Sequence, residues 1–487
     1  MKDIMTVNKK SNFMFELIAI VLGVLFTNVL NNIGNMSLII TILYCVTMIV
    51  LSIWIKKPIL LAIVFFLTYP PFIEYELAMK TIVAYRREGI TGIRDNITFP
   101  IMSFIDIYLY YLLAYSKNYK KYLSLPKKGN VIPIVLLIML ILLVSIINIT
   151  FSDNYEIKLA ILSGVNGYIK IIITYNLVKV SVVDKNDIRK ILLAIVIATP
   201  VFLLESAYVT YVKYGYLSIG KTQFSGLLAG PGATGAFLVI IIPILICSII
   251  IEKRRRSRFL IICIFIMSLV YSLLTYTRSV YLGLIISIIY IFYYFNKIQT
   301  LKKYIKVIAL CTILFIIIFI TYSGEFIIKK FISTFTENPL SDINLSARVF
   351  YWNYGLELIK KNILLGNGPN TWGLKTITGG TNLHNGYLQI LYEIGLLGFI
   401  LYFAIIFIQL KKINKTIKLY YKNNFDKDLF LISTCIKASI VGYLFTQLFS
   451  SSITSTRSVF LLWLIIFLIE KIYSLAMKNI KVNICIK

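Results

Sequence analysis

Apolar runs of about 20 residues recur along the whole chain, and they limit the possible folds more than any other feature. A run of that length is enough for one helix to cross the roughly 30 Å hydrocarbon core of a bilayer. The chain is 59% hydrophobic, above the roughly 45–50% apolar content of ordinary soluble domains. The pattern predicts an all-α polytopic membrane protein, with residues 1–487 forming a single integral membrane domain.

The hydropathy pattern predicts about fourteen transmembrane helices, within a range of about 12–14. The predicted spans lie at residues 14–31, 36–55, 58–76, 97–115, 130–149, 159–178, 191–212, 228–251, 259–276, 279–296, 307–323, 386–409, 429–449 and 458–475. With the N-terminus inside, the basic segments KNYKKYLSLPKK, EKRRRSR and KKINKTIKLYYK all fall on the cytoplasmic side, as the positive-inside rule requires. An even number of spans returns the C-terminus to that side. We therefore expect a multi-pass protein of the cell membrane with both termini in the cytoplasm.

The formal net charge of +29 is mostly explained by this topology. Nucleic-acid binding is disfavoured, because the basic blocks alternate with spans instead of forming one patch. The six cysteines show no C-x-x-C spacing, and the chain contains no Walker, Rossmann or His/Cys metal pattern. We therefore expect membrane lipids as partners, and neither a metal site nor a cofactor.

This topology leaves one long connection outside the membrane, residues 324–385, between spans 11 and 12. Loops of that length are uncommon unless they carry function. Its middle, residues 345–363, has apolar residues at helical spacing, which predicts an amphipathic helix. The predicted stripe is Leu345, Val349, Trp352, Leu356, Ile359 and Ile363. A helix on the membrane surface and a helix packed on the bundle of spans would both need such a stripe.

His384, the only histidine of the chain, ends this loop just before span 12. A helix N-terminus exposes unpaired N–H groups and a positive dipole end, so it attracts anions and disfavours a protonated imidazole. A neutral His384 could act as a general base or hydrogen-bond a reacting hydroxyl. The alternative is a solvated loop histidine, or one that caps the helix.

Arginines in the external segments predict an anionic ligand at the outer face. Arg348 lies early in the predicted amphipathic helix, and a guanidinium binds phosphate oxygens bidentately. Arg278, Arg457 and Arg94 lie in three further external turns or at span ends, where acidic partners are few. The alternative is that each arginine merely reaches the lipid headgroups.

Glu393 falls inside span 12, where a carboxylate is costly and usually has a partner or a function. We expect it to pair with an arginine or to orient a group of the loop, and we place it with His384 among the candidate catalytic residues. Gly395 and Gly398 would permit close approach of another helix.

Three motifs resemble the O-antigen ligase and Wzy-type polysaccharide polymerase superfamily. They are H-N-x-Y-L-Q-x-x-x-E-x-G-x-x-G at 384–398, R-x-x-x-W at 348–352 and L-L-G-N-G-P at 364–369. The turn T-x-T-R-S-x-Y-L-G at 275–283 is similar to the arginine turn of that family, with Thr277 where the family usually has serine. The resemblance implies a GT-C-like glycosyltransferase with one large external loop.

The resemblance also implies roles for single residues. Arg278 and Arg348 would hold the pyrophosphate of an undecaprenyl-linked glycan, and Arg457 and Arg94 are further candidates for that group. His384 would activate the acceptor hydroxyl or bind the pyrophosphate. The reaction would be a metal-independent, inverting glycosyl transfer without a nucleotide sugar, because arginine charge can replace a divalent ion beside a pyrophosphate leaving group.

Within the superfamily we favour a polymerase that joins repeat units of a surface polysaccharide. If the AT-rich composition reflects a Gram-positive source, the product would be a capsule or a wall polymer of the teichuronic acid type. An O-antigen-type ligase is the nearest alternative, and a lipid-oligosaccharide flippase is a further one. The lipid-linked oligosaccharide is the expected substrate, with a chain-length regulator or other export proteins as candidate partners.

Overall fold

The computed structural model describes residues 59–60, 62–63, 109, 111–112, 131–214, 231–296, 343–375, 382–423, 426–451 and 456–486. The regular elements within these ranges are all helices, so the predicted fold class is confirmed there. They are α6 (Val131–Thr150), α7 (Tyr155–Ser181), α8 (Lys185–Tyr214), α9 (Pro231–Ile251), α10 (Arg255–Leu274), α11 (Arg278–Phe295), α13 (Ile343–Lys361), α14 (Trp372–Lys375), α15 (Gly386–Asn423), α16 (Lys427–Thr446) and α17 (Thr456–Ile486).

Eight segments of the described ranges are long and apolar enough to cross a membrane. They are Ile132–Thr150, Ala160–Ser181, Pro231–Ile251, Arg255–Leu274, Arg278–Phe295, Gly386–Tyr420, Lys427–Thr446 and Val459–Lys478. Each overlaps one predicted span, and the predicted span 191–212 lies within α8. Apart from a few residues near 60 and 110, the spans predicted at 14–31, 36–55, 58–76, 97–115 and 307–323 lie outside the described residues. The total of fourteen therefore stays a prediction.

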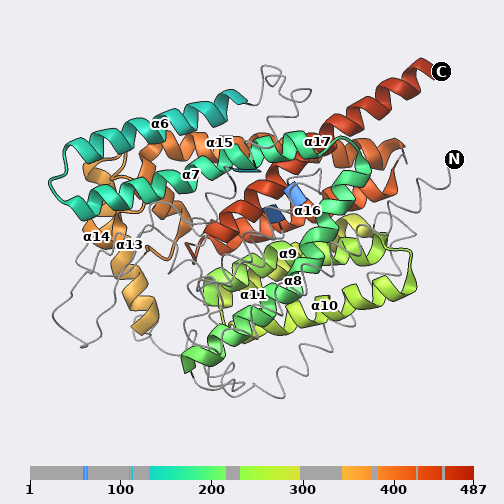
Figure 1. Ribbon diagram of the computed structural model, residues 1–487, viewed down its shortest axis with the longest axis horizontal. Helices are drawn as coiled ribbons and strands as arrows, with labels where there is room; N and C mark the ends of the chain where they lie inside the picture. Colours follow the sequence, from blue (N-terminus) through green and yellow to red (C-terminus); the bar gives the residue numbers. More distant parts are fainter. Residues whose placement is uncertain are drawn as a thin grey trace.

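The helices form one bundle in which α9 and α16 are central and α6 is peripheral (Figure 1). In α9 and α16, 78% of the span residues are buried, against 28% in α6. The exposed positions of α6 before its last residue, Thr150, are apolar, for example Met139 and Ile146, which are 63% and 61% exposed. A helix that is apolar all round but exposed on one side suits contact with lipid chains rather than with water.

Small residues allow α11 and α16 to pack closely at the centre of the bundle. A Cβ atom added to Gly442 would lie 2.7 Å from the backbone oxygen of Gly283, and one added to Gly283 would lie 2.9 Å from that of Gly442. Ser287 Oγ donates a 3.0 Å hydrogen bond to the Ala438 carbonyl across the same interface. Such small-residue contacts and hydroxyl bonds hold helices together where lipid removes the hydrophobic driving force.

The longest helix, α15, is interrupted at Gly395, whose φ of 65° and ψ of −174° are not helical. The segment after α13 replaces the hydrogen bonds lost there. The amides of Asn367 and Gly368 donate to the carbonyls of Tyr392 and Glu393 at 2.8 and 3.0 Å, and the Leu396 amide donates to the Ile363 carbonyl at 2.8 Å. Gly395 was expected to permit close helix approach. Instead it opens the helix so that a loop can bond to it.

Gly366 fits against this break only because it lacks a side chain. Its φ is 77°, and a Cβ atom there would lie 2.5 Å from the Gly395 nitrogen. We expect Gly366→Ala to destabilise the protein by about 1–3 kcal/mol through backbone strain, visible as a lower apparent Tm of the purified protein. Gly167→Ala in α7 is the matched control, because a Cβ atom there has nothing within 4 Å. Equal melting temperatures of the two variants would contradict the close fit.

Candidate functional site

The N-terminus of α15 is fixed to the C-terminal end of α16. The Gly386 amide donates to the Gln447 carbonyl at 2.8 Å, and Tyr387 Oη donates to the Leu444 carbonyl at 2.8 Å. Asn385 caps α15, because its Oδ1 accepts the amides of Tyr387 and Leu388 at 3.0 and 3.1 Å. His384, one residue before this cap, is therefore held at a defined place at one end of the bundle.

A helix is found where the amphipathic helix was predicted, as α13, two residues nearer the N-terminus than expected, but its apolar residues are not gathered on one face. It packs on α15, which is the second of the two alternatives. The predicted apolar stripe is wrong in part, because Leu356 and Ile363 are 40% and 49% exposed. The buried Ile359 lies in a small core with Trp372, Leu383 and Tyr392. Tyr351, Tyr354 and Leu358 pack against that core, so the buried face is rotated from the predicted one.

Two contacts join α13 to the His384 segment. Trp352 Nε1 donates a 3.0 Å hydrogen bond to the Leu383 carbonyl. The Tyr351 ring stacks on the His384 ring, with centroids 6.2 Å apart and planes at 21°. These contacts place the single imidazole of the chain between the middle of α13 and the start of α15.

The His384 imidazole is neutral at pH 7, as expected from the sequence. Its pKa is lowered from 6.5 to about 4, first by burial and second by the positive charge of Arg348. Burial, rather than the helix dipole that we expected, is therefore the larger cause. The backbone of His384 also adopts a positive φ of 53°. Such conformations of non-glycine residues are uncommon and concentrate at functional sites.

Glu393 is 3% exposed and joins the His384 segment to α7. Tyr168 Oη donates to its Oε2 at 3.0 Å, and Gln389 Nε2 donates to its Oε1 at 2.8 Å. Gln389 Oε1 in turn accepts the Leu383 amide at 3.0 Å. Within the described residues no ion pair joins Glu393 to an arginine, so of our two expectations only contact with the loop holds.

Sequence reasoning missed the partners of Glu393. Gln389 lies four residues before it, so helical spacing could have identified that pair. Tyr168 lies 225 residues away in the sequence, and nothing in its neighbouring residues distinguishes it from other tyrosines in the predicted spans. The sequence therefore gave no sign that Tyr168 contacts Glu393.

Of the predicted arginines, Arg348 is brought to His384, since its charge acts on the imidazole. Arg278 begins α11 at the same end of the bundle. Gly232 shows this, because a Cβ atom added to it would lie 3.9 Å from Cγ2 of Thr277, the residue before Arg278, and 3.6 Å from Ser450 Oγ. Ser450 follows the C-terminal end of α16, to which the start of α15 is bonded. Arg457 lies in the first turn of α17. Arg94 lies outside the described residues.

The single histidine makes the imidazole pKa directly measurable by NMR of protein labelled only at histidine. We expect constant ring shifts from pH 8 to about 5.5 and a midpoint near 4. Arg348→Gln should raise the midpoint, because removing a nearby positive charge favours the protonated ring. Burial persists, so the midpoint should stay below 6.5. Lys360→Gln, at an exposed position further along α13, is the control. A wild-type midpoint of 6–7 would refute the half-buried, neutral imidazole.

Comparison with known families confirms the resemblance read from the motifs. Residues 263–403 match the family described as O-antigen ligase. No curated protein matches the chain. The matched range contains α11, α13 and α14 and the first part of α15. It therefore includes His384, Glu393, Arg278 and Arg348.

Proposed function

Because residues 263–403 carry an O-antigen ligase segment within a multi-pass helical protein, we propose that the chain is a membrane glycosyltransferase. Its donor is an oligosaccharide linked to undecaprenyl pyrophosphate at the outer face of the cell membrane. Its product is a polymer of repeat units, a capsule or a wall polymer of the teichuronic acid type. A chain-length regulator or other export proteins would be its partners.

The observation that carries this proposal is the place of His384 directly before α15, where its ring stacks on Tyr351 of α13 and lies near enough to Arg348 for that charge to lower its pKa. A neutral imidazole has a free lone pair and can accept a proton from a hydroxyl group. A guanidinium binds phosphate oxygens in a planar fork. The two side chains thus combine a proton acceptor with an anion site at one end of a helix bundle, where a lipid-linked donor would present its pyrophosphate.

In the proposed reaction, the acceptor hydroxyl oxygen attacks the anomeric carbon of the donor sugar while His384 takes the hydroxyl proton. The bond between that carbon and the pyrophosphate oxygen breaks, and the lipid pyrophosphate leaves with the bonding electrons. Attack opposite to the leaving group inverts the anomeric centre. The charges of Arg348 and Arg278 stabilise the leaving group, so no metal ion is required in this scheme.

Glu393 acts in this scheme as a positioning residue. It is bonded to Gln389, and Gln389 accepts the amide of Leu383, which precedes His384. Holding that backbone fixed keeps the imidazole in a reactive orientation, and small displacements of a catalytic group cost much of the rate. Arg457 and Arg94 remain candidates for contacts to the pyrophosphate or the glycan.

Polymerase and ligase differ in what accumulates when the gene is deleted. Single repeat units on lipid, with loss of long polymer, indicate a polymerase. Long polymer that stays on lipid indicates a ligase, the alternative that the matched family description favours. Single units confined to the cytoplasmic leaflet would instead indicate a flippase and overturn the enzymatic proposal. Lipid-linked and surface glycans resolved by size distinguish the three outcomes.

The catalytic roles predict a graded set of losses on complementation of the deletion strain. His384→Ala should lower glycan transfer by about 10²–10⁴-fold, the usual contribution of a general base. Arg348→Lys should retain part of the activity and Arg348→Ala should lose it, because charge is the required property. Lys360→Ala on the exposed face of α13 is the control. Full-length polymer made by a folded His384→Ala variant would refute the mechanism.

The proposed function requires His384 on the outer side, with residues 324–385 as the large external loop and both termini in the cytoplasm. The charge pattern of the sequence supports this orientation. A cysteine replacing Lys360, in a background without native cysteines, should react with a membrane-impermeant thiol reagent in whole cells. Reaction only after cell lysis would place the loop inside and remove the donor from the site.

A further inference from the structure

A cavity of about 480 Å³ lies between α7, α15 and α17. Its wall is in part apolar and aromatic, with Val178, Val182, Phe467 and Leu475 among the lining residues. Four lysines also line it: Lys179, Lys412, Lys471 and Lys478. Among the lining residues that the structure describes, Glu470 is the single carboxylate, so this part of the lining has an excess of positive charge.

This cavity lies at the opposite end of the bundle from His384. Lys412 lies 26 residues after Gly386 in α15, beyond the break at Gly395. The uninterrupted part from Leu396 to Lys412 is about 24 Å long at roughly 1.5 Å per residue, and with the turns before the break it is comparable to the roughly 30 Å core of a bilayer. The lysines therefore belong to the other membrane face, and the cavity is a separate site from the one proposed for glycan transfer.

Lys471 and Lys412 differ in the hydrogen bonds that the protein offers their ammonium groups. Lys471 Nζ donates to the carbonyls of Lys179 and Val182 at 2.8 and 2.9 Å. Lys412 Nζ and Glu470 Oε2 are buried and have no hydrogen-bond partner among the described residues. A buried ammonium without an acceptor is unfavourable. The charge of Glu470 attracts Lys412, Lys179 and Lys471, so one carboxylate serves three ammonium groups. An oxyanion in the cavity would supply the hydrogen-bond acceptor that Lys412 lacks.

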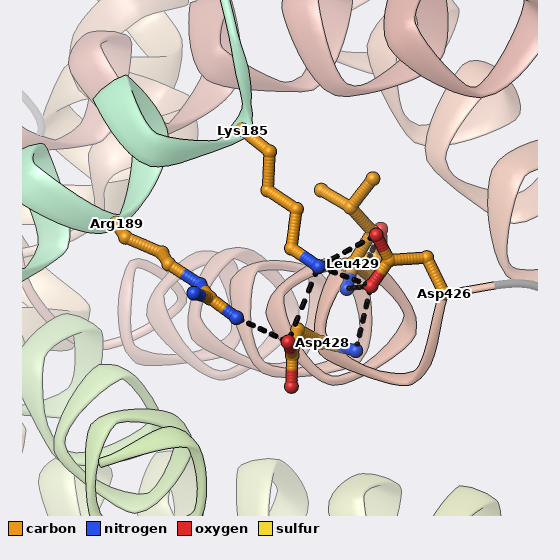
Figure 2. A network of polar contacts seen from close by, with 6 residues as sticks. Lys185, Arg189, Asp426, Asp428 and Leu429 are labelled. Carbon is orange, nitrogen blue, oxygen red and sulfur yellow. Dashed lines mark hydrogen bonds and ion pairs between the residues drawn. The ribbon is translucent and has the colours of Figure 1, made fainter. Parts of the chain in front are cut away.

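A neighbouring cluster at the same end of the bundle shows what a balanced arrangement looks like (Figure 2). Lys185 Nζ lies 2.6 Å from Asp426 Oδ1 and 3.2 Å from Asp428 Oδ2, and Arg189 pairs with Asp428. This cluster has two cations and two carboxylates, and it joins the start of α8 to the start of α16. Among the described residues the cavity has four lysines and one carboxylate; joining α17 to the end of α7 accounts for Lys471, but not for Lys412.

We infer that this cavity binds the phosphate group of an anionic membrane lipid at the face opposite to His384. Lysine ammonium groups bind phosphate as point charges, and the apolar wall suits the first part of the lipid chain. The position at the headgroup level of the membrane supplies such lipids. Free phosphate or pyrophosphate offers the same chemistry from solution. The inference does not depend on the proposed glycan transfer.

Native mass spectrometry of the full chain, released from nanodiscs of phosphatidylcholine and phosphatidylglycerol, tests this inference. We expect one tightly held phosphatidylglycerol, with retention about tenfold lower in Lys412→Gln, because a hydrogen bond between charged groups is lost. Lys412→Arg should keep the lipid. Lys411→Gln is the matched control, since Lys411 is the adjacent exposed residue and lies over the Phe407 ring instead.

Competition with inorganic pyrophosphate distinguishes the two sources. Displacement of the lipid by millimolar pyrophosphate supports a phosphate site that is filled by lipid. Binding of pyrophosphate without lipid, if it depends on Lys412, supports a phosphate site that is filled from solution. Equal lipid retention and equal pyrophosphate binding in Lys412→Gln and Lys411→Gln would overturn the inference. If Lys412→Gln aggregates, Lys478→Gln, at an exposed part of the lining, replaces it and should also lower lipid retention. Unchanged lipid retention in Lys478→Gln would likewise overturn the inference.

Discussion

The exchange of backbone hydrogen bonds at Gly395 is the constraint on which the rest of the site depends. An uninterrupted helix would pair the Leu396 amide with the Tyr392 carbonyl. Here the carbonyls of Tyr392 and Glu393 accept amides from the segment that follows α13, and the Leu396 amide donates to Ile363. Unpaired backbone groups at membrane depth are very costly. The loop and α15 must therefore form together, and α13 is held to the bundle as a consequence.

This exchange also gives a physical meaning to the spacing of two motifs. The L-L-G-N-G-P segment and the E-x-G of α15 are the two sides of one contact, because Gly366 and Gly395 approach too closely for any side chain. Glu393 lies directly at the break, with Tyr168 and Gln389 bonded to its two oxygens. The break at Gly395 thus fixes the backbone of the L-L-G-N-G-P segment and also the position of Glu393, which is linked through Gln389 to the residue before His384.

Much of the fold could be predicted from the sequence, because its signals are local. Apolar runs predicted the spans that the structure describes, and helical spacing predicted α13 to within two residues. The neutral state of His384 was also predicted, although burial, its main cause, depends on α13 packing over the loop. Contacts between distant segments could not be predicted. The buried face of α13 is set by Trp372 and Leu383, and the partner of Glu393 comes from α7.

The low pKa of His384 has a consequence for the proposed reaction. An imidazole with a pKa of about 4 is a weak base. A donor without charge would not raise that pKa. In the proposed complex, the negative charge of a pyrophosphate beside Arg348 would offset the charge of that arginine, the smaller of the two causes of the low pKa, and would favour the protonated ring. The pKa of the imidazole would then be higher with a donor bound than without one. Such coupling would limit proton transfer from water in the free protein and confine it to the complex in which a glycan can be transferred.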